Sequence, residues 1–246
     1  MSTSMQTREA TDPSEKSTET TLVEANELSK LYTGQQQVKA LDNVSLKLQQ
    51  GEFVVIRGAS GSGKTTLLLT VGTLLRPDSG TLRIMSQEPY NMSNDDRARY
   101  RAENVGFVFQ QFHLVPYLSV LENILAPALT NPQVSKDDAV RLMEQFGLSD
   151  RSNHLASQLS SGERQRCALA RAMVTNPMLL LADEPTGNLD EVNAEIVMKS
   201  LADFSKQGGT VLLVTHDQRN SEFADRTLKM SNGQLLIEDA GHAEPN

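Results

Sequence analysis

One short stretch, GASGSGKT at residues 58–65, restricts the possible folds of this chain more than any other feature. It matches the pattern G-x-x-x-x-G-K-[ST] in full, with the apolar run FVVIR before it and a helix-like segment after it. Glycines let the backbone curl so that successive N–H groups point inward at phosphate oxygens, and the following helix adds its dipole. A chance Gly/Ser turn needs neither flanking element. We therefore predict a phosphate-binding loop between a buried strand and a helix.

The residue types in this stretch also predict how a nucleotide would be held. Lys64 would bring a positive charge to the β- and γ-phosphates, and the Thr65 hydroxyl would be a ligand of Mg²⁺. ATP and Mg²⁺ are accordingly the expected ligands. The predicted nucleotide-binding residues of this segment are Gly58, Ala59, Ser60, Gly61, Ser62, Gly63, Lys64, Thr65 and Thr66.

Strand and helix patterns alternate along much of the chain, which is typical of an α/β protein with a largely parallel sheet. We expect strands near 22–28, 43–49, 53–57, 79–86, 105–110, 178–183 and 210–216, and helices at 64–75, 93–103, 161–174, 190–206 and 218–223. A hairpin over 226–239 would turn at Asn232 and Gly233. Residues 111–160 contain several prolines and helix-like segments, so we expect a helical subdomain there.

The bulk properties of the chain limit its class. Residues 1–21 are rich in Ser, Thr and Glu and predict a disordered tail before a domain at 22–241. No apolar run approaches the roughly 20 residues that cross a bilayer, and no signal peptide is evident, which favours a cytosolic protein. The lone Cys167 excludes an internal disulfide. A net charge of -8 argues weakly against nucleic-acid binding.

Polar residues at the ends of predicted strands are the candidates for chemistry. Two acids at a strand end are in general only a solvated turn, but ligands of open α/β sheets bind at the carboxyl ends of strands. Asp183 would hold Mg²⁺, and Glu184 would orient or deprotonate the attacking water. Gln110 could reach the metal or the water, and His216 could bond the γ-phosphate. Tyr32 could stack on adenine, although a lone exposed Tyr is weak evidence.

A second glycine-containing loop, LSSGERQR at 159–166, also has the composition of a phosphate-binding helix N-terminus. Together with Tyr32, GASGSGKT, FVFQQ, LLLADEP, NLD and THD in that order, it resembles the nucleotide-binding subunits of ABC transporters over about residues 22–240. The resemblance implies a P-loop NTPase fold of ABC type, with a largely parallel sheet core, an antiparallel β subdomain and a helical subdomain. It implies ATP hydrolysis coupled to transport.

The resemblance also explains why one chain carries two such loops. In ABC proteins two copies pair head to tail, and the second loop of one copy binds the γ-phosphate held by the first loop of the other. Ser160 and Gly162 would act in this way, and Asp190 in NLD would lie at the seam between the copies. The family pattern LSGGQ has Gly where this chain has Ser161 and Gln where it has Glu163, so the backbone fit at Ser161 is an open question.

Within the family, DEPTGNLD at 183–190 is similar to the branch containing LolD, MacB and FtsE, and the wider sequence most resembles LolD. This implies transmembrane partners of the LolC/LolE type at the cytoplasmic face of the inner membrane, received in a groove formed by the helical subdomain, and a role in releasing lipoproteins. MacB-like efflux and an FtsE-like role in cell division are alternatives. A soluble ABC ATPase that acts on DNA or ribosomes is a further one.

Overall fold

The computed structural model describes residues 20–34 and 37–237. The predicted disordered tail lies outside these residues except for Thr20 and Thr21, and so does the predicted end of the domain at 238–241. Within the described part of the chain, no helix is long and apolar enough to cross a membrane.

A six-stranded sheet forms the centre of the molecule, in the order β5-β6-β7-β3-β8-β9. All neighbouring pairs are parallel except the hairpin of β8 and β9. Its strands are β3 (Phe53–Arg57), β5 (Val105–Phe109), β6 (Leu179–Asp183), β7 (Thr210–Thr215), β8 (Arg226–Ser231) and β9 (Gln234–Ile237). The central strands are continuous apolar runs because helices or a second sheet cover both of their faces.

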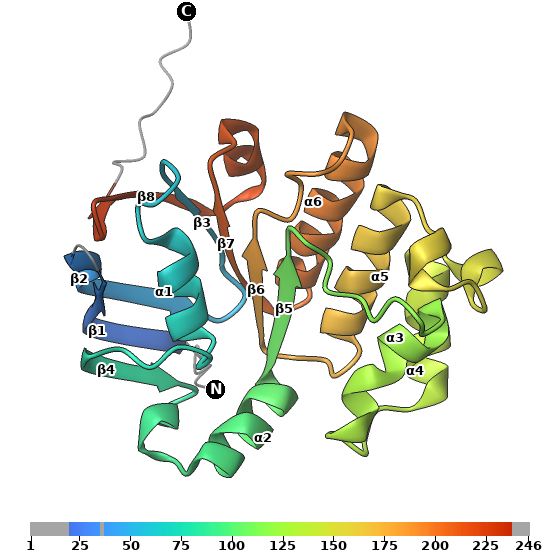
Figure 1. Ribbon diagram of the computed structural model, residues 1–246, viewed down its shortest axis with the longest axis horizontal. Coiled ribbons are helices and arrows are strands. Elements are labelled where there is room, and N and C mark those ends of the chain that lie inside the picture. Colours follow the sequence, from blue (N-terminus) through green and yellow to red (C-terminus); the bar gives the residue numbers. More distant parts are fainter. Residues whose placement is uncertain (1–19, 35–36, 238–246) are drawn as a thin grey trace, which may run out of the picture.

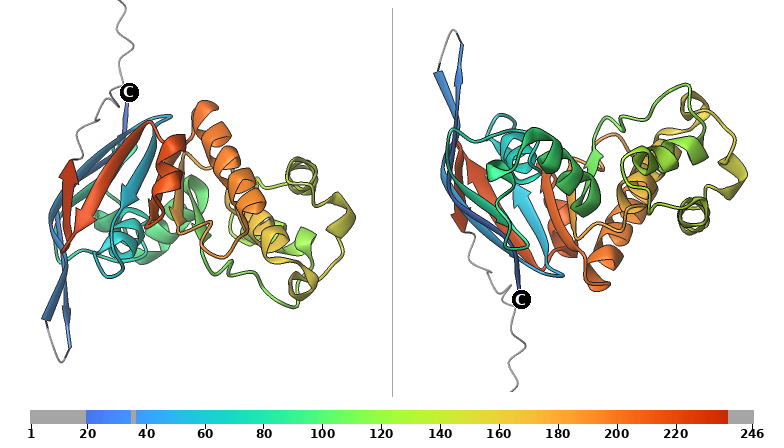
Figure 2. Two further views of the ribbon diagram at one scale, coloured as in Figure 1. Left: turned by 90° about the horizontal axis from the view of Figure 1, so that it is seen from above. Right: turned by 90° about the horizontal axis from the view of Figure 1, so that it is seen from below.

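A second, antiparallel sheet of three strands lies at one end of the molecule, in the order β2-β1-β4 (Figure 1). Its strands are β1 (Thr21–Thr33), β2 (Gln37–Gln49) and β4 (Ser79–Ile84). β1 and β2 are much longer than predicted, and their paired ends extend beyond the rest of the molecule (Figure 2). Irregularities in the pairing interrupt the alternating pattern, and Glu27 has a left-handed backbone. The predicted strand at 22–28 therefore ended before β1 does, and the predicted strand at 43–49 began after β2 does.

The helices cover the central sheet on both faces. They are α1 (Lys64–Val71), α2 (Asn94–Asn104), α3 (Val120–Leu125), α4 (Lys136–Gln145), α5 (Ser161–Met173) and α6 (Glu191–Lys206). Short 3-10 turns lie between the helices and strands: η1 (Pro89–Asn91), η2 (Ala126–Leu129), η3 (Ser149–Arg151), η4 (Ala156–Gln158) and η5 (Gln218–Phe223). Figure 1 shows α1 on the side of the small sheet, and α3, α4 and α5 at the opposite end.

The side chains of each central strand alternate between two hydrophobic cores, as the period of two requires. In β3, Val54 and Ile56 pack with α1 and the small sheet, whereas Phe53 and Val55 pack with α3 to α6. The same alternation runs along β6 and β7. It decides which way the last residue of each strand faces, and this places the candidate site.

The predicted fold class is confirmed: the main sheet is largely parallel, the small sheet is antiparallel, and residues 111–160 contain α3, α4 and three 3-10 turns. Two predicted helices were wrong in detail. The first ends at Val71 rather than Leu75, because Gly72 packs against Phe107 and Thr73 takes a left-handed backbone. The predicted helix at 218–223 is 3-10 rather than α.

Candidate nucleotide-binding site

The loop at 58–63 has the predicted setting, between the buried strand β3 and the helix α1. Gly63 precedes α1 with a φ of 106°, and no side chain caps the helix, so its first N–H groups stay directed into the loop. The loop is also supported from the hairpin β8–β9. The carbonyl of Met230 lies only 2.3 Å from where a Cβ on Gly58 would be, and Gly233 N donates to Ser62 O at 2.9 Å. A bulkier residue at position 58 would displace that support.

Lys64 lies inside the loop and is only 7% exposed. Its Nζ donates to the backbone carbonyls of Gly58 at 2.8 Å and Ala59 at 3.0 Å. The charge therefore lies at the centre of the curled backbone. The buried Ser62 Oγ has no hydrogen-bond partner, and a phosphate oxygen in the loop would supply one.

Thr65 and Asp183 come together although 118 residues separate them, with Thr65 Oγ1 donating to Asp183 Oδ1 at 3.2 Å. The alternation along β6 explains the contact: Leu179 and Leu181 face the α1 side, and Asp183 continues that series. Burial is the main cause that raises the pKa of Asp183 above its usual range. A carboxylate that is costly to ionise in this place is a good partner for a cation.

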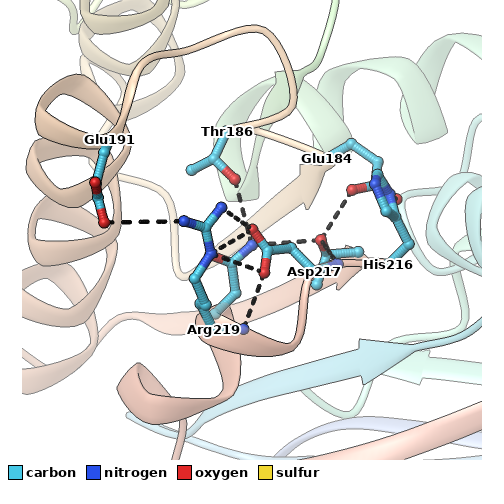
Figure 3. A network of polar contacts seen from close by, with 8 residues as sticks. Glu184, Thr186, Glu191, His216, Asp217 and Arg219 are labelled. Atoms are coloured by element: carbon cyan, nitrogen blue, oxygen red, sulfur yellow. Dashed lines mark hydrogen bonds and ion pairs between the residues drawn. The ribbon is translucent and has the colours of Figure 1, made fainter.

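The chain turns away from β6 at Glu184, whose φ of 47° is left-handed. Its carboxylate consequently reaches the end of β7. Glu184 Oε2 accepts a hydrogen bond from Thr215 Oγ1 at 2.8 Å, and Oε1 lies 2.8 Å from His216 Nδ1 (Figure 3). The two predicted acids thus have separate partners: Asp183 contacts the phosphate loop, and Glu184 contacts β7 and the exposed ring of His216.

The remaining candidates are Gln110 and Tyr32, and they lie at different places. Gln110 follows β5 and is exposed, and its Nε2 would be 2.7 Å from a Cβ on Gly187, in the segment after Glu184. Its carbonyl accepts from Asn188 Nδ2 at 3.0 Å. Gln110 therefore borders the same edge of the sheet. Tyr32 lies on the extended end of β1, pairs with Val38, and is 44% exposed.

The second loop is the capped N-terminus of α5. Ser160 Oγ accepts from Glu163 N at 3.2 Å, and Glu163 Oε2 accepts from Ser160 N at 2.8 Å, which forms a capping box. Arg151 Nε donates to Glu163 Oε1 at 2.8 Å, and this ion pair is the main reason that the pKa of Glu163 is lowered to about 2. Glu163 thus supports the loop rather than pointing away from it.

Gly162, not position 161, is where this loop requires a glycine. A Cβ on Gly162 would lie 2.2 Å from Asn193 Oδ1 on α6, and Asn193 is itself fixed by Asp190 and Arg166. Ser161 is partly exposed and its backbone is not left-handed. The replacement of the family's first glycine by Ser161 is therefore compatible with the fold.

The two loops of one chain do not meet. Figure 1 shows α1 and α5 on opposite sides of the strands β6 and β7. Ser160 and Asp190 are exposed. The structure therefore brings together the loop at 58–65, Asp183, Glu184 and His216, and it leaves Tyr32, Ser160 and Gly162 apart from them.

The donor groups at this edge suit Mg²⁺ that arrives with phosphates. Within residues 20–34 and 37–237 there is no cluster of three or more His, Cys, Asp or Glu side chains that could hold a metal ion. Mg²⁺ is usually bound by one or two protein groups together with substrate phosphates and water. The Thr65 hydroxyl beside the Asp183 carboxylate fits such a site.

Sequence reasoning missed three polar residues that hold Glu184 and the turn after it. These are Thr215, Asn220 and, from α5, Gln165, whose Nε2 donates to Pro185 O at 2.7 Å. The position of Thr215 just before His216 could have indicated it. Nothing in the sequence pattern marks the other two, because their roles depend on contacts between distant segments.

The chain as a whole is similar to known proteins. The family model described as ABC transporter matches residues 41–187. The chain is similar to a macrolide export ATP-binding/permease protein, MacB, of Chlorobaculum tepidum: 46% identity over 221 residues, covering 89% of this chain and 34% of that protein. It thus spans about a third of that relative's length.

A second relative is matched over nearly its full length. The lipoprotein-releasing system ATP-binding protein LolD 2 of Chlorobium chlorochromatii is 44% identical over 227 residues, covering 87% of this chain and 94% of that protein. Among solved structures, a dimeric post-hydrolysis state of an ATP-binding cassette bound to ADP and Pi is similar, with a TM-score of 0.83 and 35% identity. The match covers 89% of this chain and 98% of the other.

Proposed function

This chain belongs to the ABC transporter family, and on that premise we propose that it hydrolyses ATP to drive the membrane subunits of a transporter. The observation that carries this proposal is the contact between Thr65 and Asp183. It brings the phosphate loop to the strand end whose next residue is Glu184. A phosphate cradle, a place for Mg²⁺ and a candidate base therefore share one edge of the sheet.

Binding would use groups that are already in position. The backbone N–H groups of the loop and the start of α1 receive the phosphate oxygens. Lys64 Nζ exchanges its carbonyl partners for the β- and γ-phosphates. The Ser62 hydroxyl gains the partner that it lacks. Thr65 and Asp183 would hold Mg²⁺, which when bound neutralises charge on the β- and γ-phosphate oxygens.

Hydrolysis would depend on Glu184. A water oxygen attacks the γ-phosphorus, the bond to the β–γ bridging oxygen breaks, and ADP and phosphate leave. Glu184 accepts the proton that the water loses. Thr215 fixes one of its carboxylate oxygens and His216 lies against the other. Gln110 would border the water or the metal, His216 would reach the γ-phosphate, and Tyr32 would stack on the adenine.

We further propose that each site is completed by a second copy. Ser160 and Gly162 lie at the capped N-terminus of α5, on the other side of β6 and β7 from the loop at 58–65. Ser160 is exposed there, and with the Gly162 N–H it would bind the phosphate held by a second copy. In a head-to-tail pair related by a two-fold axis, both sites would close together. Asp190, exposed at the start of α6, would lie at the seam. The dimeric state of the similar cassette structure supports the pairing of two copies.

The membrane partners would be of the LolC/LolE type, and the activity would be lipoprotein release at the cytoplasmic face of the inner membrane. The near full-length match to a LolD protein supports this choice. A mainly apolar hollow of about 210 Å³ lies between β5 and the helical subdomain, lined in part by Phe107, Phe109 and Pro127. It would receive a short helix of the partner.

The alternative is a MacB-like export ATPase, which the 46% identity to such a protein favours. An FtsE-like role in cell division is a third possibility, and an ATPase acting on DNA or ribosomes is a fourth. Identification of the membrane protein that co-purifies with the full chain separates them. Subunits of the LolC/LolE type support lipoprotein release, whereas another membrane partner, or DNA or ribosomes alone, contradicts it.

Glu184→Gln tests the catalytic proposal. We expect this variant to bind ATP with wild-type affinity, to lose hydrolysis, and to form a stable dimer with Mg-ATP on size-exclusion chromatography. Asp137→Asn, at an exposed acid on α4, is the matched control and should hydrolyse normally. Normal turnover by Glu184→Gln would remove Glu184 from the role of base.

Mixed dimers test the shared site. Ser160→Ala and Lys64→Ala subunits should each be nearly inactive alone, and mixing them should restore about one intact composite site per heterodimer. Wild-type ATPase activity that persists at any dilution in a monomer would contradict the sharing of sites.

A further inference from the structure

We infer that Asn220 is a positioning residue for ATP hydrolysis: its buried side-chain amide directs the Thr215 hydroxyl at Glu184 and ties down the turn that follows Glu184. This inference rests on the proposed function. It concerns a residue outside all the motifs discussed above, in the 3-10 turn η5 that follows β7.

The geometry begins with a buried amide between two hydroxyls. Asn220 is 4% exposed, and its Nδ2 donates to Thr215 Oγ1 at 3.3 Å and to Thr186 Oγ1 at 3.3 Å. Thr186 belongs to the segment after β6, and Thr215 ends β7. Asn220 therefore joins the two segments that carry Glu184 and His216.

The Asn220 amide fixes the direction in which the Thr215 hydroxyl points. A hydroxyl has one hydrogen to donate and two lone pairs that accept. Thr215 Oγ1 receives hydrogen bonds from Asp217 N at 3.0 Å and from Asn220 Nδ2, so both acceptor sites are used. Its own hydrogen is then directed at Glu184 Oε2, 2.8 Å away. Without the Asn220 amide, one acceptor site is open and the hydroxyl can rotate.

Glu184 needs such support because its backbone is strained. A glutamate with a φ of 47° is uncommon and persists only when its surroundings hold it. Of its two carboxylate partners, His216 has a side chain that is 65% exposed, whereas Thr215 is completely buried. Thr215 is thus the rigid partner, and Asn220 is the side chain that orients it.

The charged groups of this region lie on the outer side of the network. Arg219 Nη2 lies 2.7 Å from Asp217 Oδ2, and Arg219 Nη1 lies 4.0 Å from Glu191 Oε1 (Figure 3). These ion pairs are exposed and contribute little to the fold. Asn220 is neutral, so its amide donates to Thr215 and Thr186 without adding charge near Glu184.

The test compares kcat with nucleotide binding. Asn220→Ala should lower kcat about tenfold, which is less than the 10²–10⁴-fold that a general base supplies because Glu184 itself is retained, while KM and the affinity for a fluorescent ATP analogue change less than twofold. Asn131→Ala, which removes another buried asparagine, between η2 and α4, is the matched control for the loss of a buried amide. It should lower the melting temperature and leave kcat within twofold of wild type.

A variant of nearly the same shape distinguishes an effect on catalysis from an effect on folding. Asn220→Asp keeps the volume but replaces the donor by an acceptor, which would draw the Thr215 hydrogen away from Glu184. It should lower kcat at least as much as Asn220→Ala, again with unchanged ATP affinity. Wild-type kcat in either folded variant overturns the inference.

A double-mutant cycle identifies the path of the effect. If Asn220 acts through the Thr215 hydroxyl, adding Asn220→Ala to Thr215→Val should lower kcat less than twofold further. Multiplicative losses would overturn the inference. The wild-type assay separates the proposed function from the role of Asn220. A wild-type protein without ATPase activity refutes the proposed function. An active wild type with an equally active Asn220→Ala variant refutes only the role of Asn220.

Discussion

The glycine of the second loop allows a sharp test, because two known effects predict opposite signs for Gly162→Ala. Alanine favours a helix over glycine by roughly 0.5–1 kcal/mol, so helix propensity alone would stabilise the variant. The structure predicts the reverse. The new Cβ would lie 2.2 Å from Asn193 Oδ1 and 2.4 Å from its Cγ, more than an ångström inside ordinary contact.

Asn193 cannot yield cheaply. Asp190 accepts from its backbone N–H at 2.8 Å and from its Nδ2, and Arg166 Nη1 donates to its Oδ1 at 2.6 Å. Overpacking of this kind costs about 1–3 kcal/mol. Subtraction of the propensity gain leaves about 0–2.5 kcal/mol, and the fixed position of Asn193 favours the middle of that range, a net loss of about 1–2 kcal/mol.

In a domain of this size each kcal/mol lowers the melting temperature by roughly 2–4 °C, so Gly162→Ala should melt about 2–8 °C below wild type in a calorimetric or circular dichroism scan. ATP hydrolysis should fall as well, because the α5 N-terminus is displaced. Ser161→Gly, at the neighbouring position that tolerates a side chain, is the control and should alter hydrolysis less than twofold. A Gly162→Ala variant as stable and active as wild type would refute the packing argument.

Three further predictions concern charged groups. Lys64→Ala should weaken ATP binding about 10–100-fold, the value of one charge-assisted contact, whereas Lys199→Ala on α6 should not; equal affinities in a titration would exclude the phosphate role. Because burial raises the pKa of Asp183, ionisation there costs stability as the pH rises above its usual value. Asp183→Asn should therefore raise the melting temperature without nucleotide by about 2–4 °C per kcal/mol relieved and lower hydrolysis about 100-fold; a lower melting temperature would contradict this. Glu163, with its pKa lowered to about 2, contributes stability that is present above its usual value of 4.5 and lost as the pH falls through about 2. Glu163→Gln should cost about 1 kcal/mol at pH 7, since half-exposed Arg151 weakens the pair, and less at pH 3, measured by urea unfolding; an equal loss at both pH values would argue against the ion pair.

The sequence predicted the parts of the site that are local. GASGSGKT, flanked by FVVIR, defined a strand, a loop and a helix, and the structure has all three. We also expected different tasks for Asp183 and Glu184, and in the structure the two carboxylates have separate partners.

The parts that could not be predicted depend on where the backbone departs from its regular form. Glu184 reaches Thr215 because its φ is positive, and nothing in LLLADEP indicates this. The tolerance of Ser161 was likewise undecidable, because the residue that requires glycine at position 162 is Asn193 on another helix. Helix α1 ended early for a similar reason, since Phe107 packs against Gly72.

The hairpin that supports the phosphate loop has a consequence for biosynthesis. The GASGSGKT stretch leaves the ribosome early, but Met230 and Gly233, whose backbone groups fix its curvature, follow more than 160 residues later. A nascent chain would therefore contain every nucleotide-binding motif before it could bind a nucleotide. Acquisition of ATP affinity during translation would then report that strands β8 and β9 have docked, rather than that the motif has been made.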